Sequence, residues 1–187
     1  MFCYEGAVML PALLIVLCVV LRVVPHPPNF APVGATAVFA GRTLKPWMAL
    51  SLIIAAMLVG DVILASLHGY PPVSLVTPFV YGGFFVQALL GRALRSTKGG
   101  AVGAALGGSI AFFALSNLGV WAARSLYPHT AAGLGACYVA ALPFLGGTLL
   151  GDLVWTLILS AAYRPMAARL ESRPLWVPVS TKELAAV

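Results

Sequence analysis

Residues 46–66 read PWMALSLIIAAMLVGDVILAS, and this stretch decides the fold class. It contains a single charged side chain, that of Asp61, and it begins with a proline, which suits the first turn of a helix. A helix of about 20 apolar residues crosses the roughly 30 Å hydrocarbon core of a bilayer. The stretch therefore predicts a membrane-spanning helix.

The rest of the chain has the same character. Of its 187 residues, 61% are hydrophobic and only 9% are charged, whereas about 25% of the residues of a typical soluble domain are charged. A soluble domain of this size could not bury so much apolar surface in one core, because much of its surface stays wet. Lipid is the alternative solvent, and we expect an all-α integral membrane protein.

Charges and clusters of proline and glycine divide the chain into six apolar segments. The proline-rich stretch at residues 25–30 cannot be regular helix, because proline lacks a donor and restricts the residue before it. The second segment is short and crosses the bilayer only if loop residues extend it. The expected helical segments are Ala7–Val24, Ala31–Gly41, Pro46–Ser66, Ser74–Gly91, Ala101–Ala123 and Ala136–Ala162.

Basic residues indicate the orientation, because cytoplasmic loops carry an excess of Lys and Arg. With the N-terminus inside, the loops at 42–45 and 92–98 and the C-terminal tail hold nine of the eleven basic residues. Only Arg22 and Arg124 then fall on the outer side. We predict about six transmembrane helices with both termini in the cytoplasm.

Other features limit the organisation of the chain. We predict one transmembrane domain at residues 1–163 and a short cytoplasmic tail, amphipathic or disordered, at residues 164–187. Cys3, Cys18 and Cys137 have no paired spacing, which argues against a disulfide framework. The net charge of +6 suits anionic lipid headgroups. It does not indicate nucleic-acid binding, because the basic residues form no stripe with interleaved aromatics.

Polar side chains within apolar segments are costly in lipid and therefore point to function. At a rise of 1.5 Å per residue, Arg22, Asp61 and Asn117 lie at one level in the outer part of the bilayer. Polar and aromatic residues of the outer loops adjoin that level, which predicts a binding site open to the outside. The predicted substrate-binding residues are Arg22, His26, Asn29, Asp61, Asn117, Trp121 and Tyr138.

Each of these assignments has a structural alternative. Arg22 and Asp61 could form an ion pair that only holds two helices together, and Asn117 could be an interhelical hydrogen-bonding residue. The aromatic residues could belong to the interfacial belt. Asp152 lies roughly 8 Å from the inner face, at a depth similar to that of Gln87. These two residues serve either helix packing or a coupling or proton-relay site.

An enzymatic function has little support. The sequence contains no HExxH, Walker or GxSxG motif. Asp61 and Asp152 each follow a glycine, but an aspartyl protease needs its two carboxyl groups within a few ångströms, and their expected depths differ by roughly 14 Å. Leu58 and Leu149 also stand where the GxGD motif has its first glycine. We predict no enzyme activity, no metal and no cofactor.

Several motifs along the chain form a larger pattern. They are PHPPNFAPVGA at 25–35, SNLGVW at 116–121, LYPHT at 126–130, GL at 133–134, CY at 137–138, ALPF at 141–144 and LGD at 150–152. Together they resemble the signature of an uncharacterised family of small bacterial membrane proteins that are usually described as candidate transport proteins. The resemblance covers about residues 15–160, and its first and last motifs are the most specific.

That family is similar, more distantly, to the substrate-binding S components of energy-coupling-factor vitamin transporters. The resemblance implies six helices in a bacterial inner membrane, a vitamin held near the outer face, and an energising transporter module or a second copy as partner. Many S components dock that module through an Ala-x-x-x-Ala face of the first helix, whereas Ala7 and Ala12 have a different spacing.

The combined expectation is a transport protein that binds a small water-soluble nutrient, such as a vitamin, from the outer face. One alternative is a non-transporting membrane subunit whose basic cytoplasmic loops recruit a protein partner. A less favoured alternative is an intramembrane enzyme that depends on Asp61 or Asp152.

Overall fold

The computed structural model describes residues 2–25, 27–123 and 125–170, and the regular secondary structure of this part is α-helical. Each expected apolar segment coincides with one helix, within a few residues at most ends. The helices are α1 (Phe2–Val23), α2 (Val33–Thr43), α3 (Pro46–His68), α4 (Thr77–Ala93), α5 (Gly100–Ala123) and α6 (Ala131–Leu170).

Helix α6 differs most from the expectation. It begins at Ala131 instead of Ala136, because the Thr130 hydroxyl accepts a hydrogen bond from the Gly133 N–H at 3.1 Å and so caps the helix. It also continues through Pro143 and past residue 163 into the expected tail, as far as Leu170. The remainder of that tail lies outside the described residues.

Three helices are long and apolar enough to cross a membrane. They are α3, α5 and the part of α6 from Ala131 to Tyr163, and α1 adds a shorter apolar stretch. Large apolar side chains also lie exposed on the surface, such as Leu89 of α4 and Val139 of α6, which are 64% and 66% exposed. This pattern is typical of a protein surrounded by lipid, and it indicates a membrane protein.

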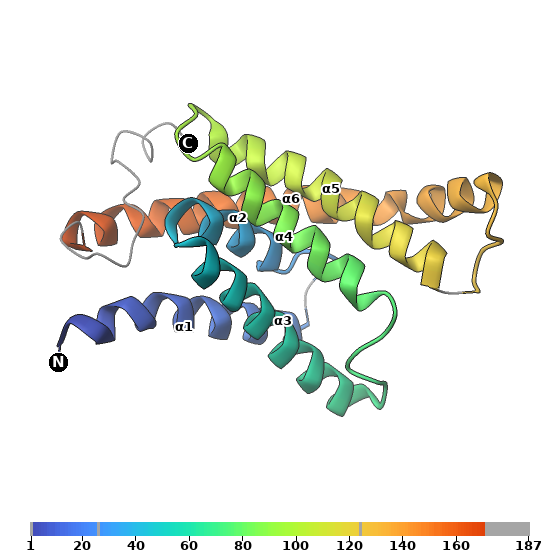
Figure 1. Cartoon of the computed structure of the whole chain (residues 1–187), viewed down its shortest axis with the longest axis horizontal. Coiled ribbons are helices and arrows are strands. Elements are labelled where there is room, and N and C mark those ends of the chain that lie inside the picture. Colours follow the sequence, from blue (N-terminus) through green and yellow to red (C-terminus); the bar gives the residue numbers. More distant parts are fainter. Residues whose placement is uncertain (1, 26, 124, 171–187) are drawn as a thin grey trace.

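Figure 1 shows where the connections between helices lie along the bundle. The start of α1, the α2–α3 connection and the α4–α5 connection lie toward one end, the α3–α4 connection lies away from that end, and the α1–α2 connection lies near the middle of the bundle. The basic loops at 42–45 and 92–98 therefore share one end of the molecule.

The short helix α2 lies at the centre of the bundle. All 11 of its residues are buried, and it contacts each of the other five helices. Gly41 lies against the Ala88 backbone and Gly91 lies against the Val38 backbone, so that the α2 and α4 main chains touch. Small residues permit such close approach in membranes. At about 16 Å in length, α2 is shorter than the hydrocarbon core.

The proline-rich connection packs against α6 before it enters α2, and the chain becomes buried from Pro32 onward. Gly147 and Gly151 of α6 lie against the backbone of Pro28 and Phe30. The Trp155 indole N–H donates to the Phe30 carbonyl oxygen at 3.0 Å. A non-helical segment therefore runs beside the middle of α6, and α2 starts within the bundle instead of at its edge.

Arg42 fixes the other end of α2. Its side chain is buried, and its guanidinium donates to the carbonyl oxygens of Leu94 at 2.9 Å and Arg95 at 3.1 Å. These carbonyls follow the last turn of α4, where helical partners run out. The contact joins α2 to the α4–α5 connection.

Candidate functional site

A cavity of about 310 Å³ lies beside the N-terminal end of α2, and all six helices contribute to its wall. We call it the central cavity. Its lining combines two charged side chains, an amide and a hydroxyl with two aromatic rings whose centroids lie 4.7 Å apart. These residues are Arg22, Asn29, Thr148, Asp152, Phe84 and Phe112.

The Asp152 carboxylate lies at the base of this cavity, where four helices meet. Its Oδ2 atom accepts hydrogen bonds of 2.7 Å from the Gln87 amide of α4 and from the Ser109 hydroxyl of α5. The backbone N–H of Ala35, in the first turn of α2, also donates to the carboxylate. The residue is buried, and a negative charge at a helix N-terminus is favourable because the helix dipole is positive there.

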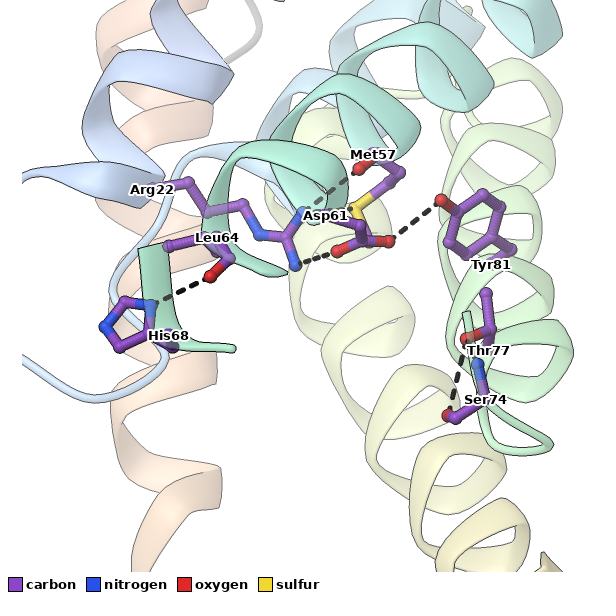
Figure 2. A network of polar contacts seen from close by, with 8 residues as sticks. All are labelled: Arg22, Met57, Asp61, Leu64, His68, Ser74, Thr77 and Tyr81. Atoms are coloured by element: carbon purple, nitrogen blue, oxygen red, sulfur yellow. Dashed lines mark hydrogen bonds and ion pairs between the residues drawn. The ribbon is translucent and has the colours of Figure 1, made fainter. Parts of the chain in front are cut away.

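A second polar network joins α1, α3 and α4 (Figure 2). The Arg22 guanidinium lies 2.6 Å from the Asp61 carboxylate, and its other terminal nitrogen donates to the Met57 carbonyl oxygen at 3.4 Å. The Tyr81 hydroxyl donates to the second Asp61 oxygen at 2.9 Å. The Arg22 and Asp61 side chains are 21% and 14% exposed, so the ion pair is mostly buried but still partly accessible to solvent.

This network separates two cavities. A second cavity of about 370 Å³, the peripheral cavity, lies under the α3–α4 connection and is lined in part by Asp61 and Tyr81. It shares Arg22, Met57 and Val80 with the central cavity. The ion pair thus lies at the boundary between a space near the end of the bundle and a space in its interior.

The predicted site residues divide into two groups. Arg22 and Asn29 line the central cavity, and Asp61 lines the peripheral cavity and binds Arg22. Asn117 and Tyr138 line neither of these cavities. The Asn117 amide donates to its own helix at Phe113, and the Tyr138 hydroxyl donates from α6 to the Ala114 carbonyl oxygen at 2.7 Å.

Trp121 also lies away from both cavities, at the α5–α6 connection. Its indole N–H donates to the Pro128 carbonyl oxygen at 3.0 Å, while its own carbonyl oxygen lies 2.9 Å from the His129 ring nitrogen. Depth along the bilayer grouped Trp121 with Arg22, but depth does not fix the face of the helix. His26 lies outside the described residues.

Several residues of the site were not predicted as ligand contacts. Gln87 and Asp152, whose expected depths are similar, do form a hydrogen bond, but their expected depth lies nearer the inner face than the predicted binding site. Ser109 and Tyr81 were not singled out. The feature of the sequence that could have identified Ser109 and Tyr81 is that each is a polar residue within an apolar segment.

No curated protein and no solved structure matches the chain. A family model described as a family of unknown function, DUF6580, matches residues 4–174, which is most of the sequence. The protein belongs to the DUF6580 family of unknown function.

Proposed function

We propose that this protein is a transport protein that binds a small water-soluble nutrient in the central cavity. The observation that carries the proposal is a cavity of about 310 Å³ with charged and polar walls inside a bundle that is apolar outside. Ionisable groups within membrane bundles typically line the path of a substrate. The volume lies at the lower end of the range for small-molecule sites, about 300–1,000 Å³.

The half-length helix α2 supports the same function. Transporters often build their sites from discontinuous helices, whose N-termini and unwound segments offer backbone groups to substrates and ions in the middle of the membrane. Here the segment Pro28–Phe30 is non-helical, and Val33 and Gly34 at the start of α2 line the cavity.

The proposal includes six crossings of a bacterial inner membrane with both termini in the cytoplasm. The proline-rich connection and α2 would together form the second crossing. The basic loops at 42–45 and 92–98, which share one end of the bundle, would then face the cytoplasm. The peripheral cavity would face outward. The S-component-like arrangement expected from the motifs remains part of this proposal.

The proposed ligand contacts are Arg22, Asn29, Thr148 and Asp152, with the Phe84 and Phe112 rings as an apolar wall. Asp61 would hold the Arg22 guanidinium in place. Asn117, Trp121 and Tyr138 would stabilise α5 and the α5–α6 connection instead of contacting the ligand.

Native mass spectrometry of the full chain, purified in detergent from its own host, tests this proposal. We expect a bound small molecule of defined mass. Val80→Phe should remove it, because Val80 lines the central cavity and a larger side chain would fill that space. Val139→Phe is the matched control, because Val139 is exposed on α6.

Retention of the molecule by Val80→Phe would show that the ligand binds elsewhere. A protein partner without a small molecule would contradict the transport proposal and favour the recruiting subunit.

A further inference from the structure

A stripe of buried polar side chains follows one face of α6. Thr148, Asp152, Thr156 and Ser160 are spaced by four residues, which places them on the same side of the helix. All four are less than 9% exposed. Polar groups in an apolar interior are costly unless they are partnered, so a continuous stripe of this kind needs a physical reason.

Two oxygen atoms near Asp152 are buried without a hydrogen-bond partner. One is Oε1 of Gln87, whose amide nitrogen already donates to Asp152. The other is the hydroxyl oxygen of Thr156, one helical turn after Asp152. Both side chains are at most 1% exposed. Buried polar atoms that lack a partner are rare in native proteins and often mark a place for an ion or water.

The charge of Asp152 points to an ion. The donors that reach its carboxylate from Gln87, Ser109 and the Ala35 backbone are all neutral. A buried carboxylate is strongly disfavoured unless a positive charge compensates it. The surrounding groups offset the negative charge with dipoles alone. Two oxygen atoms, Oε1 of Gln87 and the hydroxyl oxygen of Thr156, have no hydrogen-bond partner among the described residues.

We propose that Asp152, Gln87 and Thr156 form a sodium-binding site at the base of the central cavity. Hard cations bind carboxylate, amide and hydroxyl oxygens, and these residues offer one of each. A rotation of the Gln87 amide would exchange its nitrogen for Oε1 beside the carboxylate. A proton on Asp152 would satisfy one acceptor, whereas a metal ion contacts several oxygens at once. Asp152 is also among the proposed nutrient contacts, but sodium binding requires only these three residues and does not rest on the proposed transport function.

The first test is thermal unfolding of the purified full chain in NaCl, with choline chloride keeping the ionic strength constant and KCl as a second comparison. We expect the midpoint temperature of unfolding to rise by about 5 °C between about 1 and 100 mM Na⁺ and to stay constant at higher concentrations. Asp152→Asn and Gln87→Leu should lose this rise. Asp61→Asn should keep it, because Asp61 is also preceded by a Leu-x-Gly sequence, on α3, but lies in the other network.

Direct binding of radioactive sodium provides a second test that does not depend on unfolding. Thr156→Val keeps the shape of the side chain and removes the hydroxyl, so sodium affinity should fall by about tenfold. An unchanged affinity in Thr156→Val, or an equal midpoint rise in KCl, would overturn the proposal. A midpoint that depends on pH but not on Na⁺ would assign the site to a proton instead. None of these results bears on whether a nutrient binds.

Discussion

Gly34 of α2 lies directly against the Asp152 carboxylate of α6, so that position 34 has no room for a side chain. The carboxylate cannot retreat without losing its hydrogen bonds to Gln87 and Ser109. We predict that Gly34→Ala lowers stability by about 2–4 kcal/mol and abolishes sodium-dependent stabilisation. Thermal unfolding with and without Na⁺ measures both effects.

Gly82→Ala on α4 is the control for this substitution. Among the described residues, nothing apart from the adjacent residues and backbone of α4 itself lies within 4 Å of the position that its Cβ would occupy, and alanine is favoured over glycine in helices by about 1 kcal/mol. This variant should be neutral or slightly more stable. Similar losses in both variants would mean that the Gly34–Asp152 contact has no special role.

The contact between the α2 and α4 main chains leads to a second prediction. Gly41 and Gly91 face backbone atoms, which cannot move aside as a side chain can. Alanine at either position should separate the two helices and cost about 3 kcal/mol or more. Gly146→Ala, on an open part of α6, should be tolerated. The yield of folded protein in size-exclusion chromatography and the unfolding midpoint would distinguish these outcomes.

A double-mutant cycle tests the ion pair at the boundary between the cavities. Arg22→Met and Asp61→Leu should each destabilise the protein, because each leaves a partly buried charge without its partner. The double variant should be less destabilised than the sum, with a coupling of about 0.5–3 kcal/mol. Additive effects would contradict a direct interaction. Tyr81→Phe should cost less, about 1 kcal/mol, because it removes one hydrogen bond.

Cysteine labelling tests the proposed orientation. In a background with Cys3, Cys18 and Cys137 replaced by alanine, single cysteines are introduced at Val73 and Lys98, which are both exposed in connections. A membrane-impermeant maleimide should label Val73→Cys in intact spheroplasts and Lys98→Cys only after permeabilisation. The reverse pattern would place the basic loops outside and invert the topology.

Much of the helical framework could be predicted from the sequence. The segment expected at Pro46–Ser66 is helix α3 at Pro46–His68, and Ala101–Ala123 differs from α5 by one residue. Apolar runs in a membrane protein report directly on the transfer of each side chain from water to lipid. The start of α6 was missed because it depends on a hydrogen bond from Gly133 to Thr130 in a stretch that resembles a loop.

The sequence alone indicated that lipid surrounds the protein, and it determined the number of apolar segments and the distribution of basic residues, because each of these depends on local composition. Only the tertiary structure decided which polar residues meet. It brought Asp152 together with Gln87 and Ser109, and it separated Trp121 from Arg22. The physical reason is that lipid and the protein interior are both apolar, so the sequence of a membrane helix does not mark its inward face. Packing against other helices fixes that rotation.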